Sequence, residues 1–421
     1  MLDKRSNPAF TALAMNRLPR SPLAPAAFAD LPALPAVNIA TAGFGSYGAQ
    51  RDNLLLLSFE RPAPCAGIFT QNSIPGAPLA WSRQVVASGS ARALLVNAGN
   101  ANVFTGAQGE ADVAALATQT AQQLGCQASK VAMASTGVIG EPLPREAFSA
   151  ALTELHPQPS GAASWQAAAN AIRTTDTFAK GARRWAKTRQ GEIALLGIAK
   201  GSGMIAPNMA TLLAFLFIDA HLDSQRLQTL LNRANKTSFA AISVDSDTST
   251  SDMALAFASG QRLLESPEDL DALGAALAAL CEDLAEQIVR DGEGATKLLR
   301  IHIKRAGNAE QARQLARAVA ESPLVKTAIA GEDANWGRVL MALGKTGIPL
   351  DPTKIEIAFG AEKVTALGMR APEYDEAAVS AYLKNPEIDL WIDLGLGEAE
   401  ARFLTCDLTE GYIRINADYR S

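Results

Sequence analysis

Apolar residues recur along this chain with two different periods, which indicates a mixture of helices and strands. Helical spacing, with apolar residues three or four positions apart, extends furthest over residues 267–290, where leucines repeat from Leu270 to Leu284. Shorter segments with helical spacing lie at residues 110–125, 146–155, 164–173, 225–234 and 309–322. Runs typical of strands lie at residues 54–59, 67–70, 91–97, 131–134, 192–198, 211–218, 239–244, 299–304, 354–359, 387–394 and 401–406. The pattern predicts a mixed α/β fold with two comparable halves.

The composition supports a packed core and offers no bulk attraction for polyanions. Of the 421 residues, 48% are hydrophobic and 19% are charged, which argues against a mainly disordered chain. There are 38 Lys and Arg against 43 Asp and Glu, so the net charge is −5. No apolar run reaches the roughly 18 residues that a membrane-spanning helix needs. We therefore expect neither nucleic acid nor a membrane as a partner.

The first 37 residues differ from the rest of the chain. They are rich in Ala and Pro, and their apolar residues show little periodicity. They also lack the apolar stretch of a signal peptide. We expect residues 1–37 to form a loosely ordered extension.

Cysteine and histidine are sparse and scattered. No C-x-x-C pair occurs among the four cysteines, which are Cys65, Cys126, Cys281 and Cys406. This argues against a disulfide scaffold or a structural zinc site, and it favours a reducing cytoplasm. The three histidines, His156, His221 and His302, are equally far apart. We therefore expect no metal, and a mechanism with histidine as the base is not favoured.

The most unusual segment runs from Lys200 to Thr211 and reads KGSGMIAPNMAT. One interpretation is a loop with a buried threonine where a strand begins. The other is self-cleavage, in which a strained turn presses the Thr211 hydroxyl onto the Ala210 carbonyl. An N-to-O acyl shift and hydrolysis would then free Thr211 as a new N-terminus. Its α-amino group, with a pKa of about 7.7–8.0, can act as the base for its own hydroxyl, so no histidine is needed.

A second glycine-containing segment, STGVIG at residues 135–140, follows the strand-like run at 131–134. Backbone N–H groups and a hydroxyl at such a turn can stabilise an oxyanion. A plain turn also accounts for this pattern.

These segments and several others, in the same order, resemble the ornithine acetyltransferases of arginine biosynthesis, also called bifunctional glutamate N-acetyltransferases. The resemblance extends from about residue 40 to the end of the chain. The matching segments are FTQN at 69–72, NAGNAN at 97–102, STGVIG at 135–140, TTDT at 174–177, KGSGMIAPNMATLLAF at 200–215, SVDSDTST at 243–250, DGEGATK at 291–297, SPLVKTA at 322–328, GEDANWGR at 331–338 and INADYRS at 415–421. One departure is Ser246, where the family usually has glycine.

The resemblance implies roles for individual residues. Thr211 matches the nucleophile that carries the acetyl group as an ester, and the bond between Ala210 and Thr211 matches the scissile bond. Thr136 and Gly137 match the pair that stabilises the oxyanion. The positions that match substrate contacts are Thr175, Lys200, Thr211, Glu293, Asn416 and Ser421.

The residue types agree with the implied substrate, N2-acetyl-L-ornithine. Lys200 can meet its carboxylate as a point charge, and Glu293 can pair with its δ-ammonium group. The implied reaction passes the acetyl group through Thr211 to L-glutamate and yields N-acetylglutamate. It needs no metal or tightly held cofactor, although acetyl-CoA is the donor in members with two activities.

The resemblance also implies a fold and an assembly. The implied fold is a layered α+β sandwich of sheets and helices, similar to that of self-processing aminopeptidases. Cleavage would leave an α chain, residues 38–210 after the extension, and a β chain, residues 211–421, each forming one lobe. Two or more such αβ units are expected to assemble as a heterotetramer or larger.

Three other functions are compatible with parts of the sequence. Asp245-Ser-Asp247 after an apolar run suggests an aspartyl nucleophile with Mg²⁺, although a metal-free turn accounts for it better. A self-processing aminopeptidase would use the same kind of nucleophile. A non-catalytic amino-acid-binding relative would be free to lose the motifs around Thr136 and Thr211.

Overall fold

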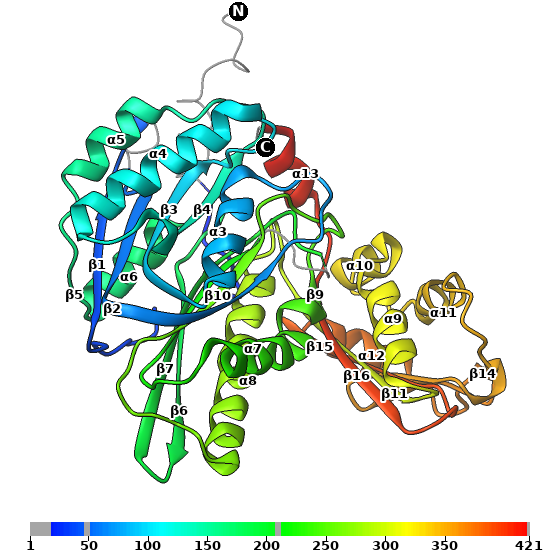
Figure 1. The fold of residues 1–421 in the computed structure, drawn as a ribbon. Helices are drawn as coiled ribbons and strands as arrows, with labels where there is room; N and C mark the ends of the chain where they lie inside the picture. Colours follow the sequence, from blue (N-terminus) through cyan, green and yellow to red (C-terminus); the bar gives the residue numbers. More distant parts are fainter. Residues whose placement is uncertain (1–17, 46–50, 207–211, 419–421) are drawn as a thin grey trace, which may run out of the picture.

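The computed structural model describes residues 18–45, 51–206 and 212–418, and its elements form two sheets with helices packed on them (Figure 1). The expected mixed α/β class is confirmed. Ala210, Thr211 and Ser421, three of the residues that the sequence analysis singled out, lie outside the described residues.

The larger sheet has nine strands within the described residues, and seven of them follow the order β4-β3-β2-β10-β8-β7-β6. The other two are β1, which pairs with β2 and with β5, and β5, which pairs with β1. The strands are β1 (Val37–Ala42), β2 (Leu54–Phe69), β3 (Ser90–Asn100), β4 (Val131–Val138), β5 (Gln158–Pro159), β6 (Lys180–Thr188), β7 (Gly191–Lys200), β8 (Leu213–Ile218) and β10 (Met253–Ala258). The accompanying helices are α3 (Ala77–Ala87), α4 (Gly106–Leu124), α5 (Arg145–Thr153), α6 (Ala162–Ala171), α7 (Ser224–Thr237) and α8 (Pro267–Arg290).

The smaller sheet has seven strands within the described residues, in the order β14-β13-β12-β15-β11-β16-β9. These are β9 (Ile242–Ser243), β11 (Leu298–Ala306), β12 (Glu356–Phe359), β13 (Glu362–Ala366), β14 (Met369–Arg370), β15 (Glu387–Asp393) and β16 (Ala399–Cys406). Its helices are α9 (Ala309–Ala320), α10 (Pro323–Ala330), α11 (Trp336–Gly344) and α12 (Glu376–Leu383). The last helix, α13 (Glu410–Asp418), returns to the larger lobe (Figure 1).

Helix α8 shows how the sequence pattern becomes structure. The Ser266 side chain accepts the backbone N–H of Asp269, and Pro267 occupies the first turn, so both features favour a helix start here. On the predicted leucine face, Leu277 and Leu284 are fully buried, whereas Leu270 near the helix start is partly buried. This face packs against β6, β7 and α7. The bounds of α8 match those predicted from the apolar spacing.

The N-terminal residues that the structure describes correct one expectation. Leu31 and Leu34 are buried, and the Trp165 indole N–H donates to the Pro32 carbonyl (3.0 Å). The Ser21 hydroxyl donates to the carbonyl of Arg290 (2.5 Å). Residues 18–37 therefore pack on the larger lobe instead of forming a loose extension, because their few leucines and carbonyls find partners far away in the sequence.

The boundary between the lobes does not fall at residue 211. Strand β8 pairs with β7 on one side and with β10 on the other, and all six of its residues are buried. Together with α7, β10 and α8, it makes the segment after residue 211 a structural part of the larger lobe. The proposed α and β chains therefore share one sheet and do not form one lobe each.

Residues 239–244 also differ from expectation. They form a 3₁₀ turn at Phe239–Ala241 followed by the two-residue strand β9, which pairs with β16. Their apolar side chains fill the core at the junction of the lobes.

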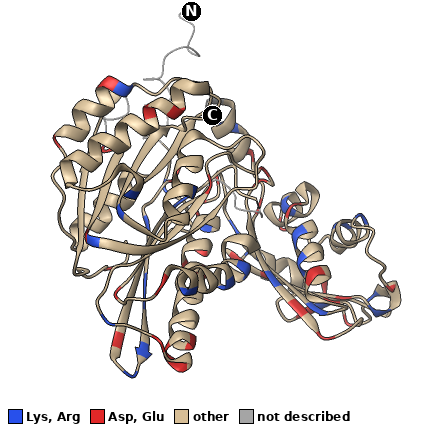
Figure 2. Cartoon of the chain, viewed as in Figure 1, with Lys and Arg blue, Asp and Glu red and all other residues tan. Residues whose placement is uncertain are grey.

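The charged residues of both signs are mixed over both lobes (Figure 2). Among the residues that the structure describes, no helix has the length and apolar character needed to cross a membrane.

Candidate functional site

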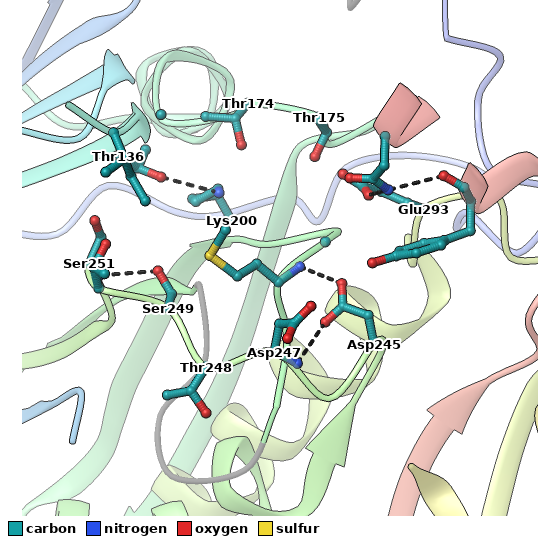
Figure 3. A pocket seen from close by; sticks show the side chains of 17 residues that line it. Thr136, Thr174, Thr175, Lys200, Asp245, Asp247, Thr248, Ser249, Ser251 and Glu293 are labelled. Atoms are coloured by element: carbon teal, nitrogen blue, oxygen red, sulfur yellow. Dashed lines mark hydrogen bonds between the residues drawn. The ribbon is translucent and has the colours of Figure 1, made fainter. Parts of the chain in front are cut away.

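One cavity of about 370 Å³ brings together the predicted site residues that the structure describes. Thr136 and Gly137 come from the end of β4, and Lys200 from the end of β7. Thr175 lies between α6 and β6, whereas Glu293 and Asn416 come from the α8–β11 connection and from α13. The cavity lining is Thr136, Gly137, Ile139, Thr174, Thr175, Lys200, Gly203, Met204, Asp245, Asp247, Thr248, Ser249, Thr250, Ser251, Glu293, Tyr412 and Asn416. In Figure 3, Thr136 and Lys200 lie on one side, Glu293 on the other, and the hydroxyls of Thr174 and Thr175 between them.

Gly137 lies at a place where only glycine fits. It belongs to the end of β4 and has a φ of 131°, which residues with a side chain rarely adopt. A Cβ atom there would lie 2.3 Å from the carbonyl carbon of Gly99 in the neighbouring strand β3. The segment expected to be a turn is therefore the end of a strand, pressed closely against β3.

The Thr136 hydroxyl is buried beside the Lys200 ammonium group. It accepts a hydrogen bond from the Lys200 ammonium group (Nζ to Oγ1, 3.4 Å). A hydroxyl that accepts in this way keeps its own proton free to donate elsewhere. Thr136 is thus able to donate to an oxygen in the cavity.

Lys200 belongs to a buried network of opposite charges. Asp176 accepts the Gly201 N–H (2.6 Å) and pairs with Lys180 (2.7 Å), which also pairs with Asp291 (2.5 Å). Burial lowers the pKa of Lys200, and the Asp176 carboxylate opposes this effect. Burial alone would raise the pKa of Asp176, but Lys180 and Lys200 hold it well below its usual range. The network therefore keeps the negatively charged Asp176 carboxylate next to Gly201, where the segment 200–211 begins.

Glu293 places a second carboxylate at the other side of the cavity. It accepts a hydrogen bond from the Asn416 amide (2.6 Å), and its own N–H donates to the Ser202 carbonyl (3.2 Å). Gly203 packs so closely that a Cβ there would lie 2.4 Å from the Glu293 carboxyl carbon. Burial raises the pKa of Glu293, and hydrogen bonds from Thr175 and Asn416 oppose the rise.

Several residues of the cavity were missed as site residues by sequence reasoning. Asp245, Tyr412 and the hydroxyl residues 248–251 line it. The segment at 243–250 was recognised as a motif, but nothing in the sequence indicated that it faces Lys200 and Glu293. Ser246 has a φ of 68°, the left-handed conformation for which glycine is the usual choice.

The Asp245 carboxylate does not have the environment of a free nucleophile. Its two oxygens accept backbone N–H groups from Met204 (2.5 Å), Ile205 (2.8 Å) and Asp247 (3.2 Å). Burial raises its pKa to about 6 in spite of these bonds. No metal-binding group of three His, Cys, Asp or Glu occurs in the part of the chain that the structure describes. The contacts favour the turn interpretation of this motif over an aspartyl phosphatase.

The cavity has the chemistry of a site for a small zwitterion. A buried ammonium group and a buried carboxylate lie on different walls, with hydroxyls between them. A ligand with one negative and one positive group can satisfy both walls at once. The Thr136 hydroxyl and the strand end at Gly137 can bind an oxygen that gains charge during acyl transfer.

Comparison with known proteins agrees with the family resemblance found in the sequence. The model of the ArgJ family matches residues 37–421. The "Arginine biosynthesis bifunctional protein ArgJ" of Zymomonas mobilis is 48% identical over 406 residues, which cover 95% of this chain and 99% of that protein. The protein with the same name from Gluconobacter oxydans is 48% identical over 413 residues, 96% of each chain. A crystal structure of ArgJ from Bacillus halodurans aligns with 48% of this chain and 96% of that chain, at 40% identity and a TM-score of 0.46. A family match over nearly the whole chain, with relatives at this level of identity, shows that the chain belongs to the ArgJ family.

Proposed function

We propose that this protein transfers the acetyl group of N2-acetyl-L-ornithine to L-glutamate through an acetyl ester on Thr211. The observation that carries the proposal is the convergence of Thr136, Lys200 and Glu293, which are far apart in the sequence, on one cavity. The family match over residues 37–421 supports the same reaction over that of an aminopeptidase. The intact set of cavity residues supports an enzyme over a binding protein without activity.

The proposed reaction has two balanced halves. The Thr211 hydroxyl oxygen attacks the acetyl carbonyl, and its proton passes to the Thr211 amine. The C–N bond breaks, the proton goes to the departing nitrogen, and ornithine leaves. The amine of glutamate then attacks the ester, the C–O bond breaks, and Thr211 recovers its proton. In both halves, Thr136 and Gly137 donate to the oxyanion.

The two charged residues orient the substrates in this proposal. Lys200 meets a substrate carboxylate, and Glu293 meets the δ-ammonium group of ornithine, held ready by Asn416. Thr175 adds a hydroxyl beside Glu293, and the resemblance implies a further substrate contact from Ser421. Every atom of the reaction is accounted for without a metal or a tightly held cofactor.

The nucleophile requires cleavage between Ala210 and Thr211, because only a free Thr211 amine can take the proton. We expect the purified protein to run as two fragments. Thr211→Ala should remain intact and inactive, and Thr211→Ser should still cleave. Mass spectrometry after incubation with acetylornithine should show one acetyl group on the fragment that begins at Thr211. An active wild type that stays intact would refute the proposal.

Two further parts of the proposal need separate measurements. The relatives carry the name "bifunctional", and we propose acetyl-CoA as a second acetyl donor, which a glutamate assay with acetyl-CoA alone would reveal. We also propose that the cleaved α and β chains stay together in the cytoplasm as a heterotetramer or larger. Native mass spectrometry of the purified enzyme would test the assembly.

A further inference from the structure

One loop contacts the chain on both sides of the proposed cleavage segment. The loop spans residues 243–253 and contains the SVDSDTST motif, to which the proposed reaction gives no role. It begins at β9 and ends at β10, so each end is anchored in a different sheet. Its two ends hold residues 204–205 and residue 212, respectively.

The first end of the loop holds the Met204–Ile205 peptide from both sides. The two oxygens of Asp245 accept the N–H groups of Met204 (2.5 Å) and Ile205 (2.8 Å). The Ile205 carbonyl accepts the Val244 N–H (2.8 Å) and the Ser243 hydroxyl (3.1 Å). The Ile205 carbonyl also accepts the Asp245 N–H (3.3 Å), and Ile205 is fully buried, so this flank is held by five hydrogen bonds.

The second end of the loop holds Leu212 in the same way. One oxygen of Asp252 accepts the Leu212 N–H (3.0 Å), and the Leu212 carbonyl accepts the Met253 N–H (3.1 Å). The Asp252 side chain is completely buried. Leu212 immediately precedes β8, the strand between β7 and β10. Asp245 therefore holds one flank of residues 206–211, and Asp252 of the same loop holds the other.

We propose that Asp245 and Asp252 are positioning residues that clamp the two flanks of the cleavage segment and thereby set where Thr211 lies relative to Thr136 and Lys200. This inference rests on the proposed function. An intramolecular acyl shift is sensitive to small displacements of the reacting atoms. The clamp supplies a fixed frame without contributing a reacting group.

The two aspartates use their oxygens differently, and this makes the clamp testable. Asp245 uses both oxygens as acceptors of the Met204 and Ile205 N–H groups, so asparagine would place an NH₂ donor against an N–H. Asp252 needs one acceptor oxygen for Leu212, and burial raises its pKa well above the ordinary value. Asparagine at position 252 keeps that acceptor, whereas alanine removes it.

The test is the cleavage half-time of the full chain made by cell-free synthesis and followed by gel electrophoresis. Asp245→Asn and Asp252→Ala should cleave about 10- to 100-fold more slowly than wild type, and Asp252→Asn should cleave within a few-fold of wild type. The matched control is Asp269→Asn, which alters a carboxylate that accepts the Arg189 N–H (2.8 Å) at the start of α8. This control should cleave at the wild-type rate.

A second readout separates positioning from general damage. In the cleaved fraction of Asp252→Ala, the kcat for acetylornithine should fall by a larger factor than its KM rises, because Asp252 holds Leu212 directly and acts on Lys200 only through its charge. Equal cleavage of wild type, Asp245→Asn and Asp252→Ala would overturn the clamp. If Asp252→Ala does not fold, equal rates for Asp245→Asn and Asp252→Asn would overturn it. A wild type that never cleaves would instead refute the proposed function.

Discussion

Replacing Lys180 by methionine tests the charge network beneath the cavity. The Lys180 side chain is completely buried and bridges Asp176 (2.7 Å) and Asp291 (2.5 Å). Methionine has a similar length but removes the ammonium group that pairs with both buried carboxylates. Removing one partner of a buried ion pair costs about 3–5 kcal/mol, because the remaining charge has lost its compensation in a medium of low polarity. We therefore expect a large loss of stability at neutral pH.

The size of the expected shift in melting temperature follows from chain length. An unfolding entropy of about 2.1 cal/mol/K per residue gives about 0.9 kcal/mol/K for 421 residues. A loss of about 3–5 kcal/mol then lowers Tm by about 3–6 °C. Scanning calorimetry at one fixed scan rate measures this shift.

Two comparison variants make the Lys180 prediction refutable. Lys363 pairs with Glu356 (3.0 Å), but both side chains are more than a third exposed, so Lys363→Met should change Tm by less than about 1 °C. Adding Asp176→Asn and Asp291→Asn to Lys180→Met should restore part of the lost stability, because the two buried carboxylates that lost Lys180 are then neutral amides. Equal Tm values for Lys180→Met and Lys363→Met, or a triple variant no more stable than Lys180→Met, would refute the reasoning.

The remaining predictions concern the cavity walls. The raised pKa of Glu293 means that its carboxylate takes up a proton at a higher pH than an ordinary glutamate. The KM for acetylornithine should therefore rise as the pH falls through that raised pKa. Glu293→Gln should raise KM about 10- to 100-fold at neutral pH and remove this pH dependence. A Gln variant with unchanged steady-state kinetics would exclude Glu293 from the site. Gly137→Ala should lower kcat about 100-fold or more, because the added Cβ meets the Gly99 backbone at 2.3 Å. Gly344→Ala, where a Cβ has no neighbour within 4 Å, is the control and should keep full activity; equal rates for the two alanine variants would contradict the close packing at Gly137.

Local signals in the sequence were sufficient for some of the regular elements. The leucine spacing predicted α8, because helix periodicity depends on residues a few positions apart. The fully apolar run after Thr211 predicted β8, since a strand buried on both faces has no polar side. The alanine-rich strand β10 and helix α3 carried weaker local signals, and neither was predicted.

The candidate site was predicted in part for a different reason. Thr136, Lys200 and Glu293 belong to motifs that resemble a known family, so their roles came from the resemblance. Residue types indicated only that a lysine and a glutamate suit a zwitterionic substrate. That these residues line one cavity depends on how β4, β7 and the α8–β11 connection are arranged.

The sequence by itself thus determined the α/β character, the main helices and strands, and the chemistry available to the site. The tertiary structure decided that residues 18–37 pack on the larger lobe, that β8 joins the two halves in one sheet, and that Asp245 and Asp252 hold both flanks of the same segment. The reason is physical: helix and strand preferences arise from neighbouring residues, whereas these contacts join residues far apart in the chain. They form only when the burial of both sheets has brought the distant segments together.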